Sequence, residues 1–408
     1  MKNLLILFCG LSVFMLSAGI SIADDTECSI HIGSNNHQFT SQNLSCNDLN
    51  IIIRRNFASE ISSTIQRLKN VKKITISDEC NDIYLDDNAD QKMCSSKNIN
   101  IPIELFSLPN LEELTLVGGV NYTVHAADHK NTIHSSIRKI NIHRAGQGDF
   151  SFLPKLDNVI EANVKISTDS GGKCENLREI PEYIYNMKNI KKLSVTMNDV
   201  PLKLNSHICT MRNLEELNFY RTIVDIPLCK NRMDKIKTVA MHYCGKKEKI
   251  NGEEYYFPSR LLQFKNIKNL NITSCGRFEM PPYGLKNLRY FQLGDCLQDD
   301  IVCQAACAGH PMGGINVINI LRYPNIERIV VGKRDIFDYT IGNLSPINSW
   351  GADPKFDKIW NAGQKKFIKN LSAAFKGGKV PHLKEVLIPD INAPDPMQIF
   401  LFKNEQSH

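Results

Sequence analysis

The sequence predicts an α/β solenoid, in which short strands and return segments alternate along a row of stacked coils. The first observation is a repeated segment with apolar anchors at positions one, four and six, which the clearest copies follow with Asn or Cys at position nine. Four complete copies begin at Ile190, Ile236, Ile267 and Leu288, and weaker copies begin at Val71, Leu111, Ile137, Val159, Leu214, Ile326 and Leu383. The second observation is that Asn precedes position one in eight of these eleven copies, at residues 70, 110, 158, 189, 213, 266, 287 and 325. This Asn is not part of the motif used to find the copies, so it is separate support for the same repeat.

Residues 1–23 have the features of a secretion signal. Lys2 precedes an apolar run from Leu4 to Leu16, and a small-residue cleavage site ends at Ala23. The run is shorter than the roughly 20 residues that span a bilayer, and no later segment is apolar for that long, so no membrane span is expected. We expect a secreted, extracellular chain, with the periplasm or the cell surface as the other destinations.

Residues 24–65 are expected to form an N-terminal, cysteine-containing cap that covers the first coil. Removal of the signal leaves 12 of the 13 cysteines, an even number in a chain that would meet an oxidising compartment. Connectivity cannot be deduced from the sequence, but short separations favour Cys28 with Cys46 and Cys80 with Cys94. A third candidate pair, Cys209 with Cys229, would join the outer segments of neighbouring coils.

Residues 66–340 are expected to form the solenoid itself. Half of the steps between successive first anchors lie between 20 and 29 residues, the length of one strand plus one return segment. Three return segments place Pro nine residues before the anchor, at Pro102, Pro181 and Pro258. Pro suits the first turn of a short helix because the amide it lacks would have no partner there. A single coil cannot bury its own apolar side, so the anchors should point inward and be covered by the next coil.

These copies resemble the L-x-x-L-x-L-x-x-N/C motif of the leucine-rich-repeat family, over about 320 residues from near Leu68 to near Ile391. The resemblance implies a curved right-handed coil with a parallel β-sheet on its concave face, capped at both ends. It also implies that ligands bind on that face, formed by positions three, five, seven and eight of each copy. At position nine, Cys244, Cys275 and Cys296 would form a row of buried thiols or an inter-coil disulfide.

Residues 341–408 are expected to supply a C-terminal helix and a last repeat that serves as a cap. Asp353-Pro354 is a typical helix start, and Gly377-Gly378 a typical stop. Apolar residues at helical spacing, from Phe356 to Phe375, predict that one face of this helix packs on the last coil.

Position three of the first six copies alternates in charge, and larger side chains appear further along the expected concave face. Lys73, Glu113, Lys139, Glu161, Lys192 and Glu216 form the alternation, which predicts a ladder of opposite charges because adjacent strands lie about 5 Å apart. Tyr and Arg are the residues that most often supply binding energy at interfaces. The predicted contact surface therefore consists of His143, Arg144, Tyr220, Arg221, His242, Tyr243 and Tyr290.

The common signatures of hydrolases, zinc proteases and nucleotide-binding enzymes are absent from the sequence. His125 and His129 lack a third ligand at a set spacing, so chance surface histidines are favoured over a metal site. Cys303 and Cys307 are interpreted as half-cystines. The net charge is +6, with cations and acids intermixed, so a nucleic-acid partner is not expected. A binding solenoid needs no cofactor, and none is expected.

The sequence therefore predicts a secreted, non-catalytic binding module that recognises another macromolecule, a protein above all, through its concave strand face. A glycan is the alternative ligand. Two other functions stay open: a structural cell-surface or envelope protein, and a carrier solenoid with a small catalytic module near its C-terminal end.

Overall fold

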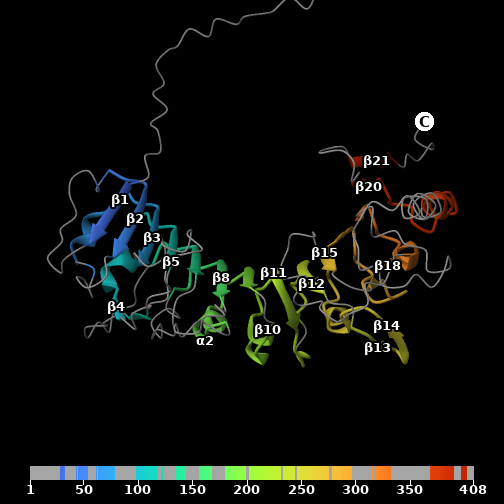
Figure 1. Ribbon diagram of the computed structural model, residues 1–408, viewed down its shortest axis with the longest axis horizontal. Coiled ribbons are helices and arrows are strands. Elements are labelled where there is room, and N and C mark those ends of the chain that lie inside the picture. The colour runs from blue at the N-terminus through green and yellow to red at the C-terminus, as the bar shows by residue number, and fades with distance from the viewer. Residues whose placement is uncertain are drawn as a thin grey trace, which may run out of the picture.

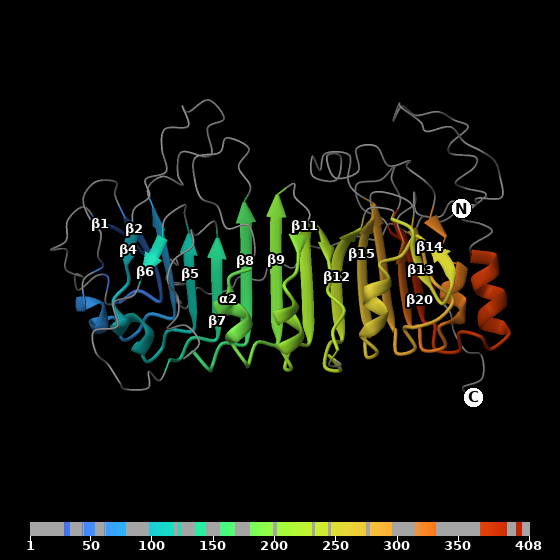
Figure 2. The same ribbon diagram turned by 90° about the horizontal axis from the view of Figure 1, so that it is seen from below.

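The computed structural model is a curved row of coils with one long sheet along it (Figures 1 and 2). The sheet lies on the inner side of the arc, and the return segments, including α2, β10 and β13, lie on the outer side (Figure 1). The structure describes residues 28–32, 43, 45–53, 61, 63–78, 98–117, 121–123, 135–143, 156–167, 180–198, 202–230, 233–243, 246–274, 278–295, 315–316, 318–331, 368–389 and 397–401.

Within these residues the main sheet is parallel from its first strand until the last pair, β20 and β21, which is antiparallel. β10 joins it beside β11. In spatial order the strands are β1 (Cys28–Ile32), β2 (Asp48–Ile53), β3 (Lys73–Asp78), β5 (Glu113–Val117), β7 (Lys139–His143), β8 (Glu161–Ser167), β9 (Lys192–Asn198), β11 (Glu216–Asp225), β12 (Thr238–Tyr243), β15 (Asn269–Ser274), β17 (Tyr290–Asp295), β19 (Arg328–Val331), β20 (Glu385–Pro389) and β21 (Met397–Leu401).

The return segments are single helical turns and two- or three-residue strands. They are η1 (Ser63–Arg67), β4 (Asn98–Asn100), η3 (Ile103–Ser107), β6 (Asn121–Thr123), α2 (Glu182–Asn186), β10 (Leu202–Lys203), η5 (Ser206–Thr210), β13 (Glu248–Ile250), β14 (Glu253–Tyr255), η6 (Ser259–Gln263), β16 (Phe278–Glu279), β18 (Ile315–Asn316) and η7 (Ile318–Arg322). Pro102, Pro181 and Pro258 directly precede η3, α2 and η6 as their N-cap residues. The helical turns predicted from these prolines are confirmed, each beginning one residue after its proline.

The register of the sheet confirms the predicted repeat. The position-four anchors of all eleven copies are aligned from strand to strand and have 0% exposed surface; they are Ile74, Leu114, Ile140, Ala162, Leu193, Leu217, Val239, Leu270, Phe291, Ile329 and Val386. Leu49 of β2 extends this row at its N-terminal end. Each coil therefore buries the apolar side of its neighbour, as a solenoid requires.

The asparagine before position one has a structural role that the motif alone does not reveal. Its side-chain amide donates a hydrogen bond to a backbone carbonyl of the preceding coil, at 2.5 to 3.1 Å; the donors are Asn110, Asn158, Asn189, Asn213, Asn266, Asn287 and Asn325. In one copy without Asn, the Ser136 hydroxyl donates to Pro109 O at 2.8 Å. This asparagine row satisfies carbonyls at the turn into each strand and joins adjacent coils.

The segment expected as an N-terminal cap contributes β1 and β2 to the main sheet, and both pair in parallel. At the other end, residues 368–376 are helical, with Leu371 and Ala374 buried, and the last repeat forms β20. The upstream part of the expected C-terminal helix lies outside the described residues. Within the described part of the chain, no helix is both long and apolar enough to cross a membrane.

Two of the three candidate disulfides are confirmed. Cys28 and Cys46 are bonded, with a sequence separation of 18, and Cys209 and Cys229 are bonded, with a separation of 20. Cys80 and Cys94 lie outside the described residues, as do Cys244, Cys275 and Cys296.

Candidate functional site

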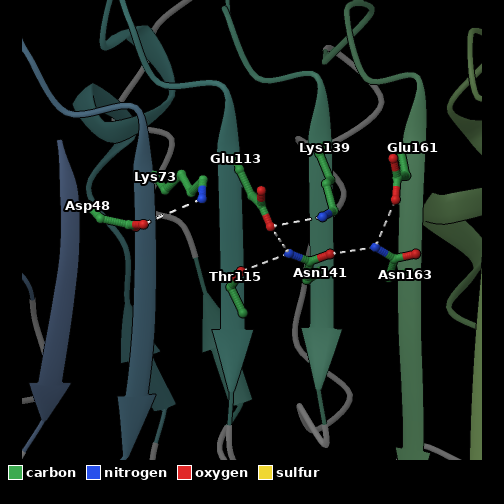
Figure 3. Close-up of polar contacts among 8 residues, drawn as sticks. All are labelled: Asp48, Lys73, Glu113, Thr115, Lys139, Asn141, Glu161 and Asn163. Carbon is green, nitrogen blue, oxygen red and sulfur yellow. Dashed lines mark hydrogen bonds and ion pairs between the residues drawn. The ribbon is translucent and has the colours of Figure 1, made fainter. Parts of the chain in front are cut away.

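The predicted charge ladder runs along the start of the strands on the inner face (Figure 3). The strands align Lys73, Glu113, Lys139, Glu161, Lys192 and Glu216 in one row, and Asp48 of β2 continues the alternation by one more residue. Ion-pair distances are 3.5 Å for Lys73 and Asp48, 3.1 Å for Lys139 and Glu113, and 3.5 Å for Lys192 and Glu216. The ladder groups therefore neutralise one another.

A second polar row at position five is tied to this ladder. The Asn141 amide donates to Glu113 Oε1 at 2.6 Å and to Thr115 Oγ1 at 2.8 Å. Asn163 donates to Asn141 Oδ1 at 2.7 Å, which links three coils (Figure 3). On β11, Asn218 is buried and donates to Glu216 Oε1 at 2.6 Å. These bonds hold the ladder carboxylates in place, so a ligand at these coils would have to displace existing contacts.

The ladder stops at β12 and resumes only at β19, where Arg328 Nε lies 2.6 Å from Glu385 Oε1. The three intervening strands carry a surface that we call the polar window, formed by the outward positions three, five and seven: Thr238, Ala240, His242, Asn269, Asn271, Thr273, Tyr290 and Gln292. Asn269 Nδ2 donates to Thr238 Oγ1 at 3.1 Å. Asn271 and Thr273 make no side-chain hydrogen bond within the described part of the chain. The window therefore offers amides and a hydroxyl in place of paired charges.

Tyr290 lies at the edge of the polar window beside the resumed ladder. Its hydroxyl donates to Gln292 Oε1 at 2.7 Å, and the Arg328 guanidinium lies 5.5 Å from its ring centroid. Burial raises the pKa of Tyr290, against the lowering effect of the Arg328 charge. The phenol stays protonated at neutral pH and keeps a polar tip on a rigid ring, a combination common at interfaces.

The predicted contact residues do not form one patch. His143 ends β7, where it is half-buried and aligned with Lys165, four strands away from His242 on β12. Tyr220 is 46% exposed, whereas His242 and Tyr290 are half-buried in the polar window. Arg221 lies within β11, and nothing is described of its side chain. Arg144 lies outside the described residues.

The prediction that Tyr243 faces outward on the strand face is wrong. Tyr243 is only 4% exposed, its hydroxyl donates to the backbone carbonyl of Lys246, and its ring lies edge-on to Phe278 with centroids 6.1 Å apart. The side chain belongs to an aromatic cluster with Phe257, Phe278 and Phe291 beneath the polar window. The sequence prediction took position eight as outward-facing, but here the strand turns the ring into the core.

A wide bulge in β11 separates the ladder from the polar window. Asn218 aligns with Ala240 of β12, but the next alignment joins Ile223 to His242, so four residues of β11 face one residue of β12. Tyr220 lies within this bulge. Bulges re-aim side chains and occur often beside functional sites. Tyr220, at the outward position seven, is exposed beside this interruption, whereas most large apolar groups of the described residues are buried.

An open groove of about 820 Å³ follows the edge where the strands begin, from the coil of Asn110 to that of Asn213. Asparagines of the row described above form part of its lining, and their amides already donate to backbone carbonyls. Its charged lining mixes Glu112 and Asp157 with Arg138 and Lys191. Within the described residues, no cluster of His, Cys, Asp or Glu could hold a metal ion. His125, His129, Cys303 and Cys307 lie outside them.

Comparisons with known proteins find distant matches. No protein-family model matches the chain. A probable disease resistance protein of Arabidopsis thaliana is 24% identical in an alignment that covers 48% of this chain and 13% of that protein. An internalin of Listeria monocytogenes matches with 14% identity and a TM-score of 0.36, over 76% of this chain and 82% of its own.

The solved complex of Toll with Spatzle from Drosophila matches with 15% identity and a TM-score of 0.38, over 74% of this chain and 42% of that chain. The chain thus spans 13% of the plant protein's length and less than half of the matched chain in that complex. The solenoid architecture itself is established by the repeated motif, the strand register and the buried anchor row of this chain.

Proposed function

We propose that this chain is a non-catalytic binding module that takes a protein partner on the polar window. The observation that carries the proposal is the interruption of the charge ladder over β12, β15 and β17. On either side of the interruption, charged groups pair with one another on adjacent strands. Within it, Asn271 and Thr273 retain unused hydrogen-bonding capacity, so a partner gains contacts there without breaking ion pairs.

The extent of the surface supports a macromolecular partner. The window spans three adjacent strands, and Tyr220 on the neighbouring β11 adds an exposed aromatic ring. A standard protein interface takes roughly 800 Å² from each partner, which the window and its flanks on a continuous sheet can supply. Tyr220 and Tyr290 are residues of the type that concentrates binding energy at such interfaces.

Export to an oxidising compartment is part of the proposal. The two disulfides support it, since such bonds persist outside the reducing cytosol. Residues 1–23, whose sequence predicts a secretion signal, lie outside the described residues. N-terminal sequencing of the chain recovered from the culture medium tests export, and recovery only inside cells with residues 1–23 still attached would contradict it.

The binding proposal is tested with a matched pair of variants. Thr273 and Ser77 both occupy position seven of their copies and are half-buried, but only Thr273 lies in the polar window. We expect Thr273→Arg to abolish partner capture from the medium or from neighbouring cells, because the larger charged side chain blocks the window. Ser77→Arg, on β3 and away from both the window and Tyr220, should leave capture intact. Equal capture by both variants, with unchanged circular dichroism, would remove the window as the site.

Photo-crosslinking identifies the partner in the same experiment. A photoreactive amino acid at position 273 should capture it, whereas the same residue at exposed Arg260 of η6, on a return segment, should not. Capture of a polysaccharide instead of a protein at position 273 would favour the glycan alternative. Capture of neighbouring copies alone would favour a structural envelope protein. The segment around Cys303, which the catalytic alternative needs, lies outside the described residues.

A further inference from the structure

Cations gather along the edge of the solenoid where the strands begin. This edge is the lower one in Figure 2. The sequence intermixes positive and negative residues, but stacking brings two positions of successive copies into line, the second residue before the first anchor and the first residue after it. From the copy at Ile190 to the copy at Leu288, the cations at these two positions are Lys188, Lys191, Arg212, Lys237, Lys265, Lys268, Lys286 and Arg289. Lys235, directly before the anchor Ile236, adds a ninth cation, and we call these nine residues the basic edge. The acids at the same edge are Glu215 and Asp234.

Backbone hydrogen bonds fix the spacing of this edge. Lys268 N donates to Lys237 O at 2.7 Å, and Arg289 N donates to Lys268 O at 2.8 Å, so three cations lie on adjacent strands with no acid between them. The asparagine row holds the next line of residues in the same way, since Asn287 donates to Lys265 O and Asn325 to Lys286 O. With strands about 4.8 Å apart, five copies form a stripe roughly 20 Å long.

Most cations of the basic edge are not neutralised. Lys237 pairs with Glu215 at 2.8 Å, Arg289 lies 3.4 Å from Glu327, and Lys235 donates to Asn213 Oδ1. The others are exposed and have no ion pair within the described part of the chain: Lys188, Lys191, Arg212, Lys265, Lys268 and Lys286. This contrasts with the concave ladder, where opposite charges alternate. A line in which cations outnumber acids, and most cations have no ion pair, is an arrangement suited to an anionic ligand.

The shape and chemistry of the edge narrow the ligand class. An anionic membrane pressed flat against this edge would also meet Glu112 and Asp157 in the preceding coils, whereas a linear polymer can follow the stripe alone. None of the described edge positions in these five copies carries an aromatic side chain on which bases could stack. The disulfides are those of a chain in an oxidising compartment, such as the cell exterior, where polysaccharides occur. We propose that the basic edge binds a linear sulfated polysaccharide by charge pairing, independently of the polar window.

Heparin serves as the probe, with the full chain immobilised and binding measured at several salt concentrations. The test variant is the triple substitution Lys265→Ala, Lys268→Ala and Lys286→Ala, which removes three unpaired cations. If each lysine contributes about fivefold to the affinity, the dissociation constant should rise about 100-fold at roughly 0.15 M salt. The slope of log affinity against log salt should fall by about one for each lysine removed.

The matched control removes the same charge elsewhere. Lys203, Lys249 and Lys379 are also exposed, but they lie on β10, on β13 and beyond the C-terminal helix. Their triple Ala variant should bind heparin like the parent chain, and both variants should keep the parent melting temperature.

Several results would overturn the proposal. These are no binding of heparin by the parent chain near 0.15 M salt, equal loss of affinity in both triple variants, and equal binding of fully desulfated heparin. Tighter edge-dependent binding of a DNA duplex or of phosphatidylserine vesicles than of heparin would also reject a sulfated polysaccharide as the ligand. The triple Ala variant at Lys265, Lys268 and Lys286 should still capture the protein partner. That result would show that heparin binding at the basic edge and partner binding at the polar window are separate.

Discussion

Truncation of Phe291 tests whether the solenoid is held together by one buried row. Phe291 has 0% exposed surface, aligns with Leu270 and Ile329, and lies 6.2 Å from Phe278 between ring centroids. Phe-to-Ala changes at such sites typically cost 3–5 kcal/mol, about 0.5–1.5 kcal/mol of which is expected from the aromatic pair. We therefore expect Phe291→Ala to lower the free energy of unfolding by about 4 kcal/mol, measured from urea denaturation.

The location of the damage is the stronger part of this prediction. Each coil contacts only its neighbours, so the loss should appear as faster amide hydrogen exchange in β15, β17 and β19, with β3 and β5 little changed. Leu114→Ala, in the same buried row near the other end, is the matched control. It should speed amide exchange in β3, β5 and β7 and leave β15, β17 and β19 little changed. A cost below about 1 kcal/mol, or the same exchange pattern in both variants, would refute the nearest-neighbour reasoning.

Three further outcomes are expected. Replacing Cys209 and Cys229 with Ser should cost about 3 kcal/mol, since the bond closes a loop with a sequence separation of 20; an unchanged melting temperature under oxidising conditions would contradict this. Asn287→Ala should cost about 1 kcal/mol in urea denaturation because Lys265 O loses its donor, whereas Asn287→Ser should recover part of that loss if a hydroxyl acts as in Ser136. The hydrogen bond from Lys384 lowers the pKa of Glu327 below its ordinary value of 4.5, so its stabilising effect is present above that pH and is lost as the pH falls through the lowered folded value. Melting temperatures between pH 6 and 3 should show a smaller acid-limb decrease for Glu327→Gln than for the parent chain, and parallel curves would contradict the pairing.

The repeat could be predicted from the sequence because the positions of the motif that are apolar are the positions that the fold buries. Leu193, Leu270 and Phe291 are apolar at a fixed position since each must be covered by the next coil, and the structure places them in one row. The charge alternation was also readable, because a single position of the motif becomes one line across the sheet. Asp48 was missed because β2 lies in a segment interpreted as a cap, outside the eleven copies.

The candidate sites were only partly readable from the sequence. Tyr243 was assigned to the surface because its position in the motif suggested an outward side chain, and only the geometry at the strand end shows that its ring enters the core. The bulge in β11 depends on how residues 219–222 pair with β12, which the motif does not encode. The basic edge left no contiguous block in the sequence, because Lys237, Lys268 and Arg289 are 31 and 21 residues apart and meet only after stacking.

The alternating ladder has a period of two coils, whereas the anchor row has a period of one. Loss of the single coil that contains β7 would leave the hydrophobic register intact but would set Glu113 directly against Glu161. Loss of two successive coils would preserve both patterns. Recombination or engineering that changes the length of the N-terminal half should therefore be tolerated best when coils are added or removed two at a time. An odd number of coils would place like charges on adjacent strands.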